Sequence, residues 1–154
     1  FLLCSAYKFY GPHLGFLYAK PGLLDQLPTD RLRTAPQAAP GKIETGTLNH
    51  AAIAGVSAAL DFLAAQNETG DYRARLVATM QQISVQERKL LEQLYTGLAA
   101  VDGLSLLGPG ISEEHRSPTI ALRMEQHRPE QIAQFLAERG ICAWHGHFYA
   151  LRAT

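Results

Sequence analysis

Two helical apolar stripes in the middle of the chain limit what this sequence can fold into. Small and branched apolar residues recur every three or four positions from Leu48 to Leu63, and a second stripe of the same period runs from Leu76 to Leu98. This spacing places the apolar side chains on one face of each helix. We expect a first helix of about 18 residues, a break at residues 67–70, and a longer second helix with Asp71 as its N-cap.

Strand signals flank these helices. Residues 1–20 favour two short strands around a Gly-Pro turn, and residues 104–107 and 119–124 favour two more. A helix is expected from Pro129 to a stop at Gly140, followed by a last strand at residues 141–144. The charged residues of the longer central helix, Arg88 and Glu92 among them, are expected on a solvated face. The fold class is therefore mixed α/β.

Composition excludes several classes of function. Hydrophobic residues make up 47% of the 154 residues and charged residues 18%, which is typical of a globular chain. Fourteen basic residues balance fourteen acidic ones, so there is no basic excess to bind nucleic acid or an anionic membrane. No apolar run approaches the roughly 20 residues of a membrane span. Two cysteines cannot build a disulfide framework, which favours a cytoplasmic, reducing location.

The ends and one long connection add two expectations. The chain starts without Met or a basic segment and stops in apolar sequence, so we expect the interior of a longer polypeptide. Residues 25–46 contain prolines and little periodicity. Such long ordered connections are usually functional.

Lys8 follows an apolar strand and precedes a Gly-rich turn. Burial of an ammonium group is costly. A desolvated lysine can serve as a nucleophile, because its neutral amine condenses with a carbonyl. The alternative is a lysine whose stem lies along the strand end while its ammonium reaches solvent.

The sequence ETGT at residues 44–47 is a second candidate site. A Gly between two hydroxyl residues, just before a helix, allows backbone N–H groups and a hydroxyl to approach a phosphate at the positive helix end. The alternative is an ordinary capped helix start.

A third candidate is the pair His145 and His147, which alternate residues of a strand would direct to one face, with Cys142 nearby. No metal-binding motif supports these residues, so no metal site is predicted.

Together, SAYKFYGPH at residues 5–13, ETGT at residues 44–47 and GICAWHGHFYA at residues 140–150 resemble the class V aminotransferases, and within them the cysteine desulfurase-like branch. The resemblance implies a fold type I pyridoxal-phosphate (PLP) enzyme that works as a homodimer. It implies that residues 1–47 end the PLP-binding large domain, with the cofactor lysine and a phosphate-binding turn. Residues 48–154 would form a connecting helix and most of the small C-terminal α/β domain.

The resemblance also assigns roles. Lys8 is expected to form the Schiff base with PLP and to move the substrate's α-proton, so that the parent enzyme is a transferase or a lyase. Ser5 is expected to donate to the cofactor phosphate, with Tyr7 beside it where desulfurases commonly have a histidine. Thr47 is expected to reach the phosphate of the neighbouring subunit's cofactor, and Gly46 to allow close approach.

Some of the family pattern is different or missing here. Tyr149 stands where true desulfurases carry the cysteine that attacks the substrate's sulfur, and tyrosine cannot accept a persulfide. The family's acidic residue for the pyridinium nitrogen and its ring-stacking residue precede Lys8, and its substrate-binding arginine follows Thr154. The 154 residues alone are therefore expected to be inactive. Transamination, elimination and epimerisation of an amino acid all stay open, as does a catalytically inactive α/β interaction domain.

Overall fold

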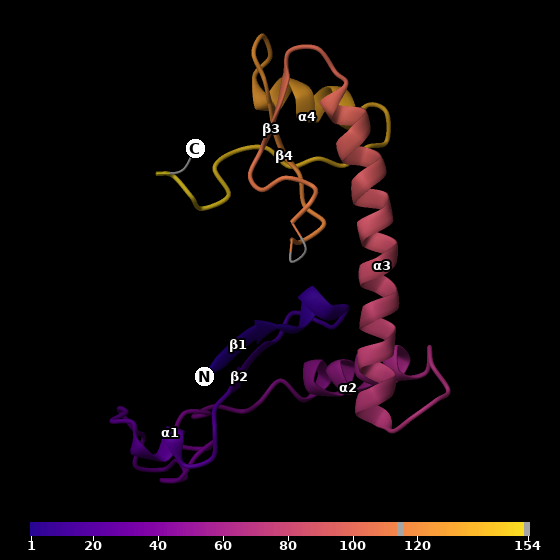
Figure 1. The fold of residues 1–154 in the computed structure, drawn as a ribbon. Helices are drawn as coiled ribbons and strands as arrows, with labels where there is room; N and C mark the ends of the chain where they lie inside the picture. Colours follow the sequence, from indigo (N-terminus) through magenta and orange to yellow (C-terminus); the bar gives the residue numbers. More distant parts are fainter. Residues whose placement is uncertain (114–115, 153–154) are drawn as a thin grey trace. The chain divides into compact units, whose positions relative to one another are not determined.

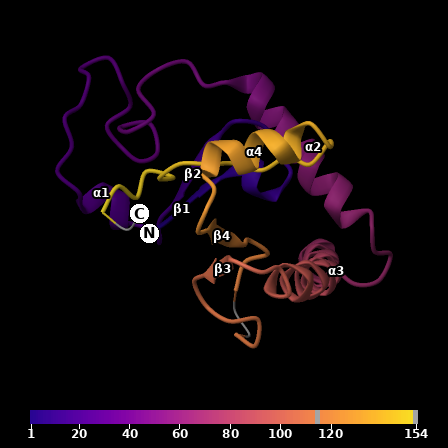
Figure 2. The same ribbon diagram turned by 90° about the horizontal axis from the view of Figure 1, so that it is seen from above.

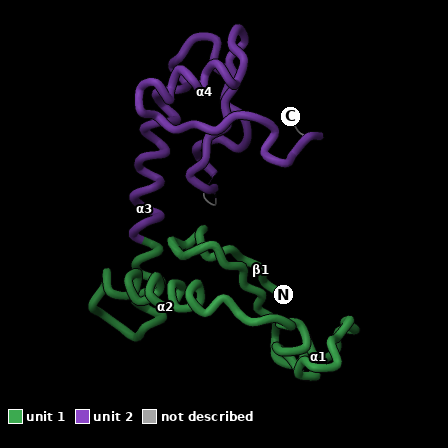
Figure 3. Tube along the Cα trace, turned by 180° about the vertical axis from the view of Figure 1, so that it is seen from behind, with its two compact units in different colours: residues 1–81 green, residues 82–154 purple. Residues whose placement is uncertain are grey.

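The computed structural model describes residues 1–113 and 116–152. Figure 1 shows two pairs of short strands with helices between and after them, which confirms the predicted mixed α/β class. The chain forms two compact units, residues 1–81 and 82–154 (Figure 3). Among the helices described, none has both the length and the hydropathy needed to cross a membrane.

The first unit opens with a β-hairpin. Strands β1 (Leu2–Ser5) and β2 (Gly15–Tyr18) pair antiparallel, with Leu2 opposite Tyr18 and Ser5 opposite Gly15. The prediction of two short strands around a Gly-Pro turn is confirmed. A 3-10 helix, η1 (Ala6–Phe9), stands between them and was not predicted. One turn of 3-10 helix leaves no periodicity for sequence analysis to detect.

The expected long connection follows β2. It contains one short helix, α1 (Leu23–Gln26), and otherwise consists of turns and irregular backbone up to residue 49. Hydrogen bonds within the connection are local or join residues 25–27 to residues 39–42.

Helices α2 (His50–Ala64) and α3 (Tyr72–Ala99) are the two predicted central helices. The side chain of Asn49 accepts the Ala52 N–H at 3.0 Å, so α2 starts after this cap and has 15 residues instead of the expected 18. The Asp71 carboxylate accepts the Ala74 N–H at 2.8 Å, which confirms the predicted N-cap of α3.

Residues of the first unit join the C-terminal end of α2 to the start of α3. Val56, Leu63 and Ala64 of α2 are buried. Thr79 is also buried, and its hydroxyl donates to the carbonyl of Leu63 at 2.8 Å. The Tyr72 hydroxyl donates to Asp61 at 2.9 Å. The pKa of Tyr72 is raised, and partial burial is the largest cause. The hydrogen bond to Asp61 and the negative charge of Asp61 raise this pKa further.

The second unit contains a second hairpin and the last helix. Strands β3 (Leu104–Leu107) and β4 (Ala121–Met124) pair antiparallel, with Leu104 opposite Met124, and Figure 2 shows this pair beside α3, which is seen end-on. Helix α4 (Pro129–Ala137) begins with Pro at its first position, as predicted. Gly140 has φ 73°, which a helix stop requires and which glycine adopts without strain.

Two expectations for this unit are wrong. No strand forms at residues 141–144, because the Ile141 N–H bonds back to the carbonyl of Leu136 at 3.0 Å and so completes the end of α4. On α3, Leu91 is buried, whereas Leu90 and Leu94 of the predicted stripe are each 54% exposed. Adjacent leucines lie about 100° apart around a helix, and sequence periodicity did not distinguish which of them faces inward.

Candidate functional site

The segment that carries Lys8 is a tightly built turn. Buried Ala6 lies at its centre: its N–H donates to the Leu14 carbonyl at 2.8 Å, and its carbonyl accepts the Gly11 N–H at 2.9 Å. A Cβ on Gly11 would lie 2.9 Å from the Ala6 Cβ and 3.0 Å from the Ala6 oxygen. Gly11 is therefore required for close packing, and the turn holds the backbone on both sides of Lys8.

Lys8 itself is exposed, as in the alternative of a lysine whose ammonium reaches solvent. The reason lies in η1, where three residues complete one turn. Ala6 and Phe9 fall on the same side of it and are the more buried pair, which leaves Tyr7 and Lys8 on the open side.

Two of the other predicted cofactor residues lie next to Lys8. Ser5 is half-buried at the end of β1, and its hydroxyl makes no capping hydrogen bond to η1 although Ser5 is the N-cap residue. The ring of Tyr7 is 49% exposed and stacks on His13 with centroids 4.7 Å apart. The hairpin thus places a hydroxyl, a phenol and a primary amine within four residues at one end.

Gly46 and Thr47 lie between the turns of the long connection and the start of α2. Both are exposed, and a Cβ on Gly46 would meet no atom within 4 Å. The backbone here is open to a ligand, and the Thr47 hydroxyl precedes the positive end of α2 by three residues. Asn49 already caps that helix, so Thr47 is not the capping residue.

Helix α2 also supports the Lys8 turn. A Cβ on Gly55 would lie 3.3 Å from Cγ of Pro12, which shows that the tip of the hairpin lies against α2 (Figure 1). Both predicted cofactor segments therefore belong to the first unit and adjoin the same helix. In the part of the chain that the structure describes, no hydrogen bond joins Lys8 to Gly46 or Thr47.

The C-terminal loop adopts an unusual backbone. Phe148 and Tyr149 have φ 49° and 64°, which residues other than glycine rarely adopt, and Gly146 before them has φ 113°. The Tyr149 N–H donates to Nδ1 of His147 at 3.1 Å, and the Tyr149 side chain is 95% exposed.

The two histidines of this loop have different partners: His147 accepts the Tyr149 N–H, and His145 lies near Glu130. His145 Nδ1 lies 3.9 Å from a carboxylate oxygen of Glu130 on α4. Within residues 1–113 and 116–152, no three His, Cys, Asp or Glu side chains form a group that could hold a metal ion.

Sequence analysis missed Lys42. It is 3% exposed, and its ammonium donates to the carbonyls of Asp25 and Leu27, both at 3.1 Å. Of the described charged side chains, it is the one that is buried. The connection around it has no periodicity, so its sequence gave no sign that a lysine would turn inward.

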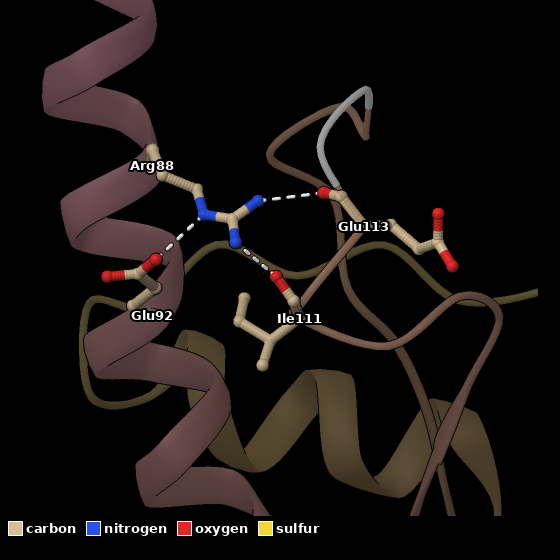
Figure 4. Close-up of polar contacts among 4 residues, drawn as sticks. All are labelled: Arg88, Glu92, Ile111 and Glu113. Atoms are coloured by element: carbon tan, nitrogen blue, oxygen red, sulfur yellow. Dashed lines mark hydrogen bonds and ion pairs between the residues drawn. The ribbon is translucent and has the colours of Figure 1, made fainter.

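Arg88 of α3 was predicted to be merely solvated, which is wrong. Its Nε donates to Glu92 at 2.8 Å, and its terminal nitrogens donate to the carbonyls of Ile111 and Glu113 (Figure 4). This guanidinium ties α3 to the loop between β3 and β4. A cavity of about 360 Å³ adjoins it, lined also by Arg116, which donates to two further carbonyls of the same loop. Both guanidinium groups thus hold the loop.

Comparison with known proteins gives a consistent result. The family model for "Aminotransferase class-V" matches residues 1–153. A cysteine desulfurase of Escherichia coli O157:H7 (strain EC4115 / EHEC) is 30% identical over 98% of this chain, and one of Yersinia pestis (strain Pestoides F) is 29% identical over the same share. The alignment covers 36% of each relative's length, so the chain spans about a third of these proteins. The chain belongs to the class V aminotransferase family.

Proposed function

We propose that these 154 residues form part of a PLP-dependent enzyme that acts on an amino acid, with Lys8 as the residue that bonds covalently to the cofactor. The observation that carries the proposal is the position of Lys8. It is an accessible primary amine on a closely packed, hydrogen-bonded turn, in a chain that matches the class V aminotransferase family over residues 1–153.

The residues present fit this cofactor. Its aldehyde needs a reachable amine, and Lys8 is exposed. Its phosphate needs hydrogen-bond donors, and the Ser5 hydroxyl is not used to cap η1. A bound phosphate also needs open backbone, and nothing lies within 4 Å of where a Gly46 Cβ would stand.

When bound, PLP supplies an aldehyde that condenses with an amine and a ring that withdraws electrons from the substrate's Cα. The chain's own residues would divide the remaining work. Lys8 provides the amine and, once released, accepts and returns a proton. Ser5 and Tyr7 donate to the phosphate, and the turn through Gly11 holds them in one geometry.

Thr47 is proposed to serve the phosphate of a second subunit's cofactor, in a homodimer. It lies on a different segment from the Lys8 turn and is exposed, which suits a donor offered outward. In this proposal residues 1–47 close the cofactor domain, and residues 48–154 form the connecting helix and the small domain. Cys4 and Cys142 are exposed free thiols, which supports a reducing, cytoplasmic location.

Tyr149 bears on the reaction type. It is almost fully exposed on a backbone that few residues adopt, and its phenol cannot take up sulfur as a persulfide. We therefore propose transamination, elimination or epimerisation of an amino acid instead of desulfuration through a loop cysteine.

The test is a titration of the full-length protein with PLP, followed by visible absorbance. We expect a saturable absorbance change with the wild-type protein, its loss in Lys8→Ala, and its retention in Lys20→Ala, which removes another exposed lysine beyond the same hairpin. A wild-type protein that gives no change would contradict the enzyme proposal and favour an interaction domain. Amino acids that alter the absorbance would then identify the substrate class.

A further inference from the structure

Lys42 connects two parts of the long segment that leads to Gly46 and Thr47. Its ammonium donates to the carbonyls of Asp25 and Leu27 at the end of α1. The Asp25 carboxylate in turn accepts the N–H of Ala39 at 2.8 Å. Residues 25–27 and residues 39–42 are therefore joined by side chains from both segments: Lys42 donates to the first segment, and Asp25 accepts from the second.

Local backbone hydrogen bonds continue from this junction up to Thr45, next to the proposed phosphate turn. The Lys42 N–H donates to Ala38, and the N–H groups of Ile43 and Glu44 donate to Pro40, at 2.9 to 3.0 Å. The Thr45 N–H donates to Ile43 at 3.0 Å. On the far side, Asn49 fixes the start of α2. Only residues 46–48 lie between these two fixed points.

The burial of Lys42 indicates that its ammonium has a structural role and is not simply solvated at the surface. A lysine that is 3% exposed and bonded to carbonyl groups has exchanged water for fixed partners. Removing its ammonium leaves two carbonyls without their donor at a part-buried position, and they would regain partners by moving the segment.

We propose that Lys42 is a positioning residue for the cofactor phosphate. Its ammonium fixes residues 38–45 against the end of α1 and so sets where Gly46 and Thr47 present their donors. This inference rests on the proposed function, because it assumes that a PLP phosphate is the ligand of that turn.

The experiment compares the affinity of the full-length protein for PLP and for pyridoxal, which has the same aldehyde but no phosphate. Lys42→Met removes the ammonium and keeps the length of the side chain, whereas Lys42→Arg keeps a donor. Lys89→Met makes the same chemical change at an exposed lysine of α3. Asp25→Ala cuts the second connection, at an exposed residue, and tests the same junction if Lys42→Met does not fold.

We expect Lys42→Met to weaken PLP binding about tenfold, the loss of roughly one hydrogen bond to a charged group, while pyridoxal binding stays unchanged. Asp25→Ala should act in the same direction. Lys42→Arg should restore PLP affinity, and Lys89→Met should leave both affinities unchanged.

Three outcomes would overturn the inference. Unchanged PLP affinity in both Lys42→Met and Asp25→Ala would show that the junction does not position the phosphate turn. An equal loss of PLP and pyridoxal affinity would show a general structural role. A wild-type protein that binds neither compound would remove the proposed function together with this inference, whereas in the first two cases the proposed function stands.

Discussion

Thr79 tests whether one buried hydroxyl holds α2 against α3, and with it the helix that supports both proposed cofactor segments. The Thr79 side chain is 2% exposed, donates to the Leu63 carbonyl at 2.8 Å and accepts from the Asn67 amide at 2.7 Å. The substitution Thr79→Val keeps the shape of the side chain and removes both hydrogen bonds.

The structure limits how much stability Thr79→Val can remove. A lost hydrogen bond costs about 1 kcal/mol, and a buried group left without any partner costs about 1–3 kcal/mol. The Leu63 carbonyl keeps a bond from the Gln66 N–H at 3.3 Å, and Asn67 is only half-buried and can reach water. Neither the Leu63 carbonyl nor the Asn67 amide is left buried without a partner, so we expect a loss of about 1–2 kcal/mol in the free energy of unfolding.

Urea unfolding followed by circular dichroism measures this loss. The matched control is Thr96→Val, the same change at an exposed position of α3, where a surface substitution should stay within about 0.5 kcal/mol. Equal unfolding free energies for the two variants would contradict this prediction, because Thr79 would then contribute no more than an exposed threonine.

Three further predictions concern single side chains. Gly11→Ala should destabilise the hairpin by about 1–3 kcal/mol in thermal unfolding and weaken PLP binding, because the new Cβ would lie 2.9 Å from the Ala6 Cβ. The control is Gly15→Ala, whose Cβ would meet no atom within 4 Å, and it should change neither quantity. The pKa of Tyr72 is raised in the folded protein, so its hydrogen bond to Asp61 contributes its full stability below the ordinary tyrosine pKa of about 10. That contribution is lost as the pH rises through the higher pKa of the folded state. Tyr72→Phe should therefore remove this loss of stability at alkaline pH, as measured by thermal unfolding across that pH range. Arg88→Met should speed amide hydrogen exchange in residues 110–113, and unchanged exchange would show that the guanidinium does not hold the loop.

Local signals predicted much of the fold. Asp71 was expected to cap α3 because a carboxylate at a helix start accepts orphan N–H groups, and it does so. The Gly-Pro turn predicted the first hairpin, and Pro129 and Gly140 predicted the bounds of α4 to within a few residues. In each case the information lies within a few residues of the feature it determines.

Features that depend on distant contacts were not predicted. Which of Leu90 and Leu91 faces inward depends on what packs against α3, and the sequence of α3 alone does not carry that information. Lys42 and Arg88 find carbonyl partners 15 to 25 residues away, through side chains whose sequence context is that of ordinary surface residues.

In the candidate site, too, the features that depend on neighbouring residues were predicted and those that depend on the folded turn were not. Lys8, Ser5 and Tyr7 were selected from a motif, and the structure places them together because they are neighbours in sequence. The exposure of Lys8 follows from the 3-10 turn, and the sequence alone had left open whether its ammonium would be buried or reach solvent. The roles of these residues, and those of Gly46 and Thr47, stay predictions.

Of the chain's four lysines, Lys8 is the one proposed to bond to the cofactor. The most direct measurement is reduction of the PLP-treated full-length protein with borohydride, followed by digestion and peptide mass spectrometry. We predict a pyridoxyl group on Lys8 at near one equivalent. None is expected on Lys42, whose ammonium is buried and bonded to two carbonyls. A stoichiometric adduct on another lysine, or an unmodified Lys8, would contradict the account.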